Sequence, residues 1–178
     1  MIRPQKELNK LLDEVITQAK ALGIPLSSQI NEDVVVNQRA KSRFGCCKRI
    51  KASRGKSIEG MHYIIEISKA LSESSIESIK EVLAHEVLHT APGGYNHTGN
   101  WKKYAGQMNK EYGYNIKRTN SPDALGVELP GEKPPAKYLI VCEKCGNTQE
   151  RIRSSKVIKK PSLYRCKCGG RLKVQVVE

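Results

Sequence analysis

The sequence of 178 residues predicts an α+β fold, with a helical core and a small β-sheet followed by a small β module. Three observations lead to this prediction. Apolar residues recur at helical spacing in three segments, and short runs rich in Val and Ile have the pattern of strands. Paired cysteines near the C-terminus follow a proline-rich stretch. The predicted parts are a first domain over residues 1–119, a linker over 120–137 and the cysteine-containing module over 138–178.

The first predicted helix covers residues 4–22. Pro4 stands near its start and Gly23 at its end, positions at which these residues commonly begin and end helices. Its apolar face consists of Leu8, Leu11, Leu12, Val15, Ile16, Ala19 and Leu22.

Strands are predicted where the period of the pattern changes. Residues 34–36 and 62–67 are rich in β-branched residues. A third strand is predicted around residues 44–47, with Gly45 and Gly55 at turn or bulge positions.

Two further helices follow. Ser74 and Glu77 form a predicted capping box for the second helix, which ends before the Pro92-Gly93-Gly94 run. The third helix ends at Gly113. Their apolar stripes are Ile76, Ile79, Leu83 and Val87 in the second, and Trp101, Tyr104, Ala105, Met108 and Tyr112 in the third.

The second helix contains the motif His85-Glu86-Val87-Leu88-His89. Residues four apart lie on one face of a helix, so both imidazoles can reach one metal ion. Zinc accepts imidazole nitrogen and lowers the pKa of a water molecule, and Glu86 follows the first ligand, where it can accept the proton of that water. The motif therefore predicts a zincin-type site with Glu86 as the catalytic base.

A third protein ligand is needed for such a zinc site. His97 follows across the glycine-rich break, which lets the chain fold back, and it is the preferred candidate. The spacing from His89 differs from that of metzincins. Glu111 on the next helix is the rival candidate, although a solvated charge at a helix end describes it better.

These residues resemble a known family. The run HEVLHTAPGGYNHTGNWKKYAGQMNKEYGYNIKR is similar to the SprT-like zinc metallopeptidase domain of Spartan-related proteins, and NQRAKSRFGCC with HYIIEIS is similar to the upstream part of that domain. The resemblance implies a zincin-like core in which His85, His89 and His97 bind zinc and Glu86 is the base. It further implies proteolysis of DNA-bound proteins such as DNA–protein crosslinks, often stimulated by DNA.

The C-terminal module is predicted to be a zinc ribbon. Two pairs of cysteines, each followed by glycine, can supply four thiolates to one structural zinc ion, a second ion beside the catalytic one. The second pair has one intervening residue where two are usual. The predicted ligands are Cys142, Cys145, Cys166 and Cys168, and hairpin strands are expected between the pairs.

The net charge of +13 is unevenly spread and suggests a polyanionic partner. From residue 137 onward, 11 Lys and Arg residues face 3 acidic residues. DNA, with single-stranded or junction DNA as candidates, is the expected partner besides protein substrates. The candidate contacts are Arg151, Arg153, Lys156, Lys159, Lys160, Tyr164 and Arg165. A second basic run is compatible with two roles, a DNA-binding track near the active site or a solvated strand edge protected by charge. It consists of Arg39, Lys41, Arg43, Lys48, Arg49 and Lys51.

Other features suggest a cytoplasmic protein without a membrane segment. No apolar stretch has the length of a membrane span, and the N-terminal residues do not form a signal peptide. Six cysteines in such a protein favour metal chemistry over disulfides. Cys46 and Cys47 are expected to be buried packing residues, and His62 to be structural.

Two functions remain in view at this point. The first is a metallopeptidase acting near DNA, in which Tyr95, Tyr112 or Tyr114 could stabilise the oxyanion. The second is a nucleic-acid-binding zinc protein with a non-catalytic core. The presence of Glu86, which the chemistry needs and metal binding does not, favours the enzyme. The sequence does not predict an oligomeric state.

Overall fold

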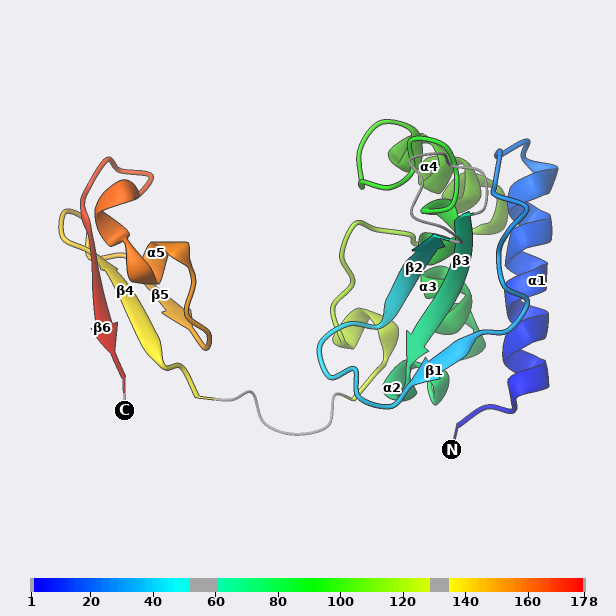
Figure 1. Ribbon diagram of the computed structural model, residues 1–178, viewed down its shortest axis with the longest axis horizontal. Coiled ribbons are helices and arrows are strands. Elements are labelled where there is room, and N and C mark those ends of the chain that lie inside the picture. The colour runs from blue at the N-terminus through cyan, green and yellow to red at the C-terminus, as the bar shows by residue number, and fades with distance from the viewer. Residues whose placement is uncertain (1, 52–60, 129–134, 178) are drawn as a thin grey trace. The chain divides into compact units, whose positions relative to one another are not determined.

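The computed structural model describes residues 2–51, 61–128 and 135–177. The chain divides into two compact units, Met1–Pro130 and Gly131–Glu178 (Figure 1). Each unit has helices and a three-stranded sheet of its own, so the α+β prediction is confirmed. The predicted turn position Gly55 lies outside the described residues.

The helices of the first unit are α1 (Gln5–Ala21), the short α2 (Lys69–Ser72), α3 (Ile76–Leu88) and α4 (Asn100–Tyr112). α1 packs along α3, and most of the apolar residues predicted for the two helices lie in or against the core. The exception is Ile76, which is exposed in the first turn of α3. Gly113 ends α4 with a φ of 70°, a left-handed conformation that glycine adopts without strain. In the described ranges, no helix is both long and apolar enough to cross a membrane.

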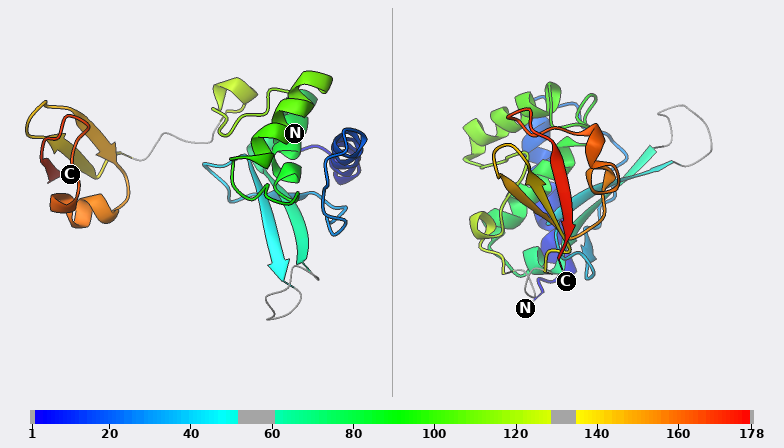
Figure 2. Two further views of the ribbon diagram at one scale, coloured as in Figure 1. Left: turned by 90° about the horizontal axis from the view of Figure 1, so that it is seen from above. Right: turned by 90° about the vertical axis from the view of Figure 1, so that its left-hand side faces the viewer.

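The sheet of the first unit has the order β1-β3-β2, with β1 (Val35–Asn37) parallel and β2 (Gly45–Lys51) antiparallel to the central β3 (Met61–Ser68). α3 lies against one face of this sheet (Figure 2). Ile65 and Ile67 are fully buried beneath the helices. Residues paired directly across antiparallel strands share a face, so the partners of Ile67, Ile65 and Tyr63 also face α3. Those partners are Gly45, Cys47 and Arg49.

The start of α3 differs from the predicted capping box by one residue. The hydroxyl of Ser75 caps the helix by accepting from the backbone N–H of Ser78 at 3.1 Å. The Ser74 hydroxyl instead donates to the carbonyl of Leu71, at the end of α2. The sequence pattern did not predict α2, and this short helix is the reason that Ser74 is already engaged.

The predicted linker contributes part of the first unit's core. Residues Asp123–Leu125 form the 3-10 turn η1, and Leu125 and Val127 are buried in the hydrophobic core of this unit. The Ser78 hydroxyl donates to the carbonyl of Leu125 at 2.9 Å and joins this segment to α3. The core of the first unit therefore extends at least to Val127.

The second unit has an antiparallel sheet with the order β5-β4-β6, formed by Thr148–Arg151, Tyr138–Cys142 and Leu172–Val176. Of the hairpin strands expected between the cysteine pairs, only β5 lies there, because its partner β4 ends at Cys142. The same segment also contains two short helical turns, α5 (Lys156–Lys159) and η2 (Pro161–Leu163). Those two turns were not predicted, because four or fewer residues are too short for a helical period.

Candidate metal centres

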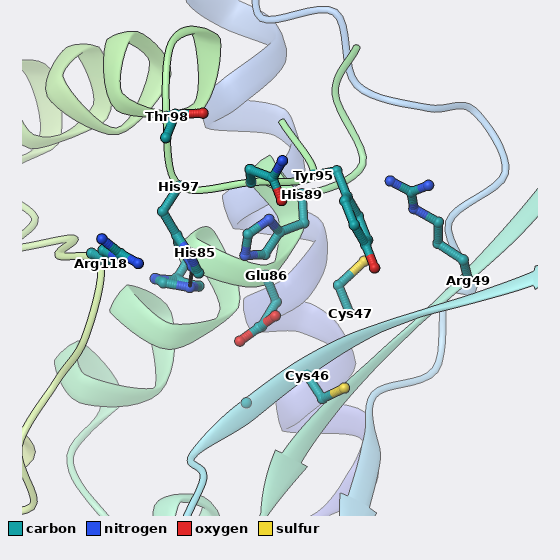
Figure 3. Close-up of a pocket in the computed structure, with 12 residues that line it drawn as sticks. Cys46, Cys47, Arg49, His85, Glu86, His89, Tyr95, His97, Thr98 and Arg118 are labelled. Carbon is teal, nitrogen blue, oxygen red and sulfur yellow. Dashed lines mark hydrogen bonds between the residues drawn. The ribbon is translucent and has the colours of Figure 1, made fainter. Parts of the chain in front are cut away.

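Three imidazoles converge in the first unit. His85 lies in the last turn of α3, His89 caps the end of that helix, and His97 comes from the loop between α3 and α4 (Figure 3). Their candidate ligand nitrogens all lie within 4.8 Å of one another, and the Nε2 atoms of His85 and His97 are 2.8 Å apart. The structure therefore brings together all three residues that the sequence suggested for this site.

The glycines after α3 allow the following loop to turn back against the end of this helix. Gly93 has a φ of 72°, and a Cβ atom at Gly94 would lie 2.3 Å from the carbonyl oxygen of Leu88. Only a residue without a side chain allows this close approach of the loop to the end of the helix. The fold-back places His97 opposite His85.

Two backbone carbonyls orient the imidazoles. His85 Nδ1 lies 2.9 Å from the Lys117 carbonyl, and His89 Nδ1 lies 2.7 Å from the Gly94 carbonyl. A carbonyl can only accept, so each Nδ1 carries the proton and each Nε2 presents a lone pair. Metal-ligating histidines typically have such a second partner. The donor set and its orientation fit a zinc ion.

The site favours neutral imidazole. Burial, aided by the neighbouring His89 and His97, lowers the pKa of His85 to about 4. Burial also lowers the pKa of His89 and of His97, and the guanidinium of Arg118 adds to the effect on His97. Neutral rings are the form that binds metal.

The indole ring of Trp101 packs against all three imidazole rings. Its ring centroid lies 4.8 Å from those of His85 and His97 and 5.8 Å from that of His89. Its Nε1–H donates to the carbonyl of His85 at 3.4 Å, and the side chain is almost fully buried. Trp101 thus packs α4 onto α3, as its place on the predicted apolar face implied, and also excludes water from one side of the cluster.

Glu86 is a buried carboxylic acid beside this cluster, with only 8% of the residue exposed. Burial raises its pKa to about 7, although a backbone hydrogen bond from Cys47 and the charge of Arg43 both favour the carboxylate. β2 approaches α3 very closely here. A Cβ atom at Gly45 would lie 2.6 Å from Glu86 Oε1 and 2.6 Å from Val82 Cγ1.

A cavity of about 670 Å³ joins the histidines and Glu86. β2 contributes Cys46, Cys47 and Arg49 to its lining. Neither cysteine is fully buried, so the prediction of two buried packing residues is correct only in part: Cys47 packs against the hydrophobic core, and both cysteines also line the cavity. Burial together with the nearby Glu86 raises the pKa of the Cys47 thiol to about 12. Sequence reasoning missed these contributions to the cavity, since the pairing register that turns Cys47 and Arg49 toward α3 is not visible in the sequence.

Arg118 also lines the cavity, and sequence reasoning did not predict this. It directly follows Lys117, whose carbonyl holds His85, and its guanidinium lies near His97 (Figure 3). No periodic pattern covers residues 113–120, so nothing in the sequence singled it out.

The structure separates the alternatives that the sequence left open. Tyr112 and Tyr114 hydrogen-bond to Gln18 on α1, whereas Tyr95 lines the cavity. Glu111 is exposed on α4 and does not belong to the metal-binding cluster. His62 is exposed on β3 and also lies outside that cluster.

The basic residues of the first unit have different surroundings. Arg43 and Lys48 form ion pairs with Glu66, a buried carboxylate on β3. Burial opposes ionisation of Glu66, but hydrogen bonds from Lys48 and Asn37 hold its pKa below the usual value. The guanidinium of Arg49 lies 3.8 Å above the ring of Tyr95.

The four cysteines of the second unit form the other cluster. Their sulfurs all lie within 4.8 Å of one another, with 3.5 Å between Cys142 and Cys168 and 3.7 Å between Cys145 and Cys166. Gly146 and Gly169 have positive φ, as the tight turns after each pair require. The shorter second pair therefore still brings its sulfurs to the common site, and the cluster fits a zinc ribbon.

The acidity of these thiols is consistent with a bound cation. Backbone N–H groups of Cys145 and Lys144 lower the pKa of Cys142 to about 6. At Cys168 the N–H of Gly170 favours the thiolate, but the adjacent thiols of Cys145 and Cys142 prevail and raise the pKa to about 12. Four sulfurs this close cannot all be thiolates unless a positive ion lies among them.

The candidate DNA contacts lie on the same unit. Most of them are exposed, on or near α5 and η2. Arg165 donates to the carbonyls of Ser162 and Tyr164, and Arg151 donates to the side chain of Gln149. The exposed members are Arg153, Lys156, Lys159, Lys160, Tyr164 and Arg165.

We expect protein prepared without chelators to contain two zinc ions per chain, as measured by inductively coupled plasma mass spectrometry. Each cluster supplies a complete protein ligand set, so His97→Ala should lose one ion and Cys145→Ser the other. His62→Ala is the matched control and should retain both. Unchanged zinc content in His97→Ala would contradict the histidine site.

The zinc-free first unit should lose stability in mild acid. The pKa of His85 is about 4 in the folded chain, whereas the ordinary pKa of histidine, which applies to the unfolded chain, is 6.5. Between these two pH values, the unfolded chain binds a proton that the folded chain does not. The free energy of unfolding therefore falls as pH falls from about 6.5 toward 4. Urea denaturation followed by the fluorescence of Trp101, the only tryptophan, measures this.

His85→Gln should show a shallower decline over the same pH range. His62→Gln, at an exposed position, serves as the control and should behave as the wild type. Identical pH dependence in His85→Gln and the wild type would show that burial does not destabilise the charged imidazole.

Comparison with protein families gives one match. The model of the SprT-like family matches residues 12–120, which cover the C-terminal part of α1, the sheet, α3, α4 and all three histidines. Searches of curated proteins and of solved structures give no significant match. The match spans more than half of the chain and includes the candidate metal centre, and the chain therefore belongs to the SprT-like family.

Proposed function

We propose that this chain is a zinc-dependent endopeptidase that acts on DNA-associated proteins, DNA–protein crosslinks among them. Membership of the SprT-like family supports a metallopeptidase-like role. The observation that carries the proposal is the placement of Glu86. It is a buried carboxyl group with a pKa of about 7, in the same cavity as three neutral imidazoles whose Nε2 atoms converge.

The residues of the cavity have distinct roles in this proposal. His85, His89 and His97 would hold the zinc ion, which when bound lowers the pKa of water and polarises a carbonyl group. Glu86 accepts a proton from the attacking water and returns it to the leaving amine. A pKa near 7 suits both steps, because neither proton transfer is then strongly uphill at neutral pH.

The surrounding residues hold the Glu86 carboxyl group in the position that this proton transfer requires. The N–H of Cys47 and the close approach of Gly45 restrict the Glu86 carboxyl group, while Trp101 closes the cluster from behind. In this proposal Tyr95, whose ring lines the cavity, is the candidate donor of a hydrogen bond to the developing oxyanion.

The link to DNA is supported by charge. The region from residue 137 onward carries a net charge of +8, from 11 basic and 3 acidic residues, and four thiolates with one zinc ion would reduce it to about +6. Exposed lysines and arginines with Tyr164 can meet phosphates and stack on a base. In this proposal the second unit recruits DNA and the first unit cleaves the protein bound to it.

The test is cleavage of a basic DNA-binding protein by the wild type and by Glu86→Gln. We expect Glu86→Gln to retain both zinc ions and to lose at least about 100-fold in rate, because the proton acceptor is removed. Glu111→Gln, at an exposed glutamate of α4, is the matched control and should cleave normally.

The same assay with single-stranded DNA tests the second half of the proposal. A rate that rises with DNA supports action on DNA-bound proteins. Cleavage that ignores DNA would leave a peptidase without this substrate class. No Glu86-dependent cleavage in either condition, with both metal sites filled, would favour the non-catalytic nucleic-acid-binding protein.

Gly45→Ala should reduce peptidase activity while zinc content stays normal. The added methyl group would lie 2.6 Å from Glu86 Oε1, so the carboxyl group must move. A displacement of this size is expected to cost about 10–100-fold in rate. Gly106→Ala on α4, where a Cβ atom meets nothing within 4 Å, is the control. Full activity in Gly45→Ala would exclude a strict requirement for the observed position of Glu86.

A further inference from the structure

A second cavity of about 600 Å³ adjoins the metal cavity. The two cavities share Arg49, His89 and Tyr95 in their linings. The Arg49 guanidinium stacked on the Tyr95 ring thus forms a wall common to both (Figure 3). A chain segment bound at the histidines would therefore lie beside the second cavity, because His89 lines both.

The walls of the second cavity are largely apolar. Leu26, Met61 and Ala91 line it together with the rings of Tyr63 and Tyr95. Two of its hydroxyl groups already form hydrogen bonds within the protein. Thr90 donates to the carbonyl of Val87, and Ser27 accepts from the N–H of Gln29.

The charges around the second cavity disfavour the binding of a basic side chain. Among the described residues, no aspartate or glutamate lines it. Nothing there would compensate the burial of a lysine or arginine side chain. The guanidinium of Arg49, the charged group among the described lining residues, lies over the ring of Tyr95, and its N–H edge can still pair with a carboxylate.

Both rims of the second cavity are held by backbone hydrogen bonds. Tyr63 on β3 donates to the carbonyl of Gln29 and accepts from Asn31, each at 2.8 Å, which fixes the segment after α1. On the other rim, the N–H of Gly94 donates to the carbonyl of Ala91 at 2.9 Å. The cavity is therefore preformed, as binding pockets for small groups usually are.

We propose that the second cavity is a specificity subsite, which binds an apolar side chain of the protein substrate at a residue flanking the cleaved bond. This inference rests on the proposed peptidase function, and it adds a sequence preference to it. Burial of a leucine, methionine or phenylalanine side chain against these walls is favourable, whereas a lysine or arginine side chain would lose hydration without a carboxylate partner.

The first test is the mapping of cleavage sites in a random peptide library by mass spectrometry. We expect leucine, methionine and phenylalanine to exceed lysine and arginine at one flanking position by about tenfold or more. Ser28→Trp, an exposed position on the rim, should narrow the cavity and shift the preference toward alanine. Thr17→Trp on the exposed face of α1 is the matched control and should leave the profile unchanged.

A second test does not depend on turnover. Calorimetry with zinc-loaded Glu86→Gln should show leucine hydroxamate binding about tenfold or more tightly than glycine hydroxamate. Ser28→Trp in the same background should reduce this difference, and Thr17→Trp should not.

The outcomes separate the subsite from the peptidase activity. A flat cleavage profile, an acidic preference, or equal binding of the two hydroxamates would overturn the subsite while leaving the peptidase intact. Absence of cleavage together with a preference for the leucine compound would overturn the peptidase and leave the subsite. Absence of binding by either compound would also overturn the subsite.

Discussion

Two hydrogen bonds between imidazole nitrogens and backbone carbonyls determine the geometry of the first unit's metal centre. The carbonyl of Lys117 holds His85, and the carbonyl of Gly94 holds His89. These carbonyls belong to the two segments that flank α4, so the end of α3 is tied to the chain on both sides of its neighbour. The ligands are therefore arranged by tertiary structure, and an isolated α3 helix would not present them in this way. Binding of a metal ion at this cluster would consequently be coupled to the folding of the unit.

The pKa of Glu86 results from opposing effects, of which burial is the largest. Burial favours the neutral acid, while the backbone of Cys47 and the charge of Arg43 favour the carboxylate. Arg43 is itself paired with Glu66 on β3, together with Lys48. This pairing limits the positive potential near Glu86, which would otherwise lower its pKa further. The buried Glu66 thus affects the candidate base through its pairing with Arg43.

Much of this arrangement could be predicted from periodic patterns and close spacing. The helical period located α1, α3 and α4, and the two cysteine pairs and the His-Glu-x-x-His run identified both clusters within a few residues. What the sequence could not provide was tertiary pairing. The row formed by Gly45, Cys47 and Arg49 faces the cavity because of its register with β3. Register depends on the partner strand, and a single strand does not encode it.

Short segments were the other source of error. Leu125 and Val127 are two isolated apolar residues among prolines and polar residues, so no period marked them as part of the core. Similarly, Ser74 was predicted to cap α3 because α2 is too short to be recognised in the sequence. In the structure its hydroxyl instead donates to the carbonyl of Leu71 in α2.

The thiol of Cys47 lies in the candidate active-site cavity, close to a carboxyl group and three metal-binding imidazoles. Thiols react with electrophiles and oxidants, and bind soft metals, almost entirely as thiolates. With its pKa raised to about 12, this sulfur is protonated throughout the physiological range. The cavity therefore contains a cysteine that is chemically quiet. At neutral pH, alkylating reagents and peroxide should therefore react only slowly with this thiol, which sets the candidate site apart from the cysteine-dependent hydrolases.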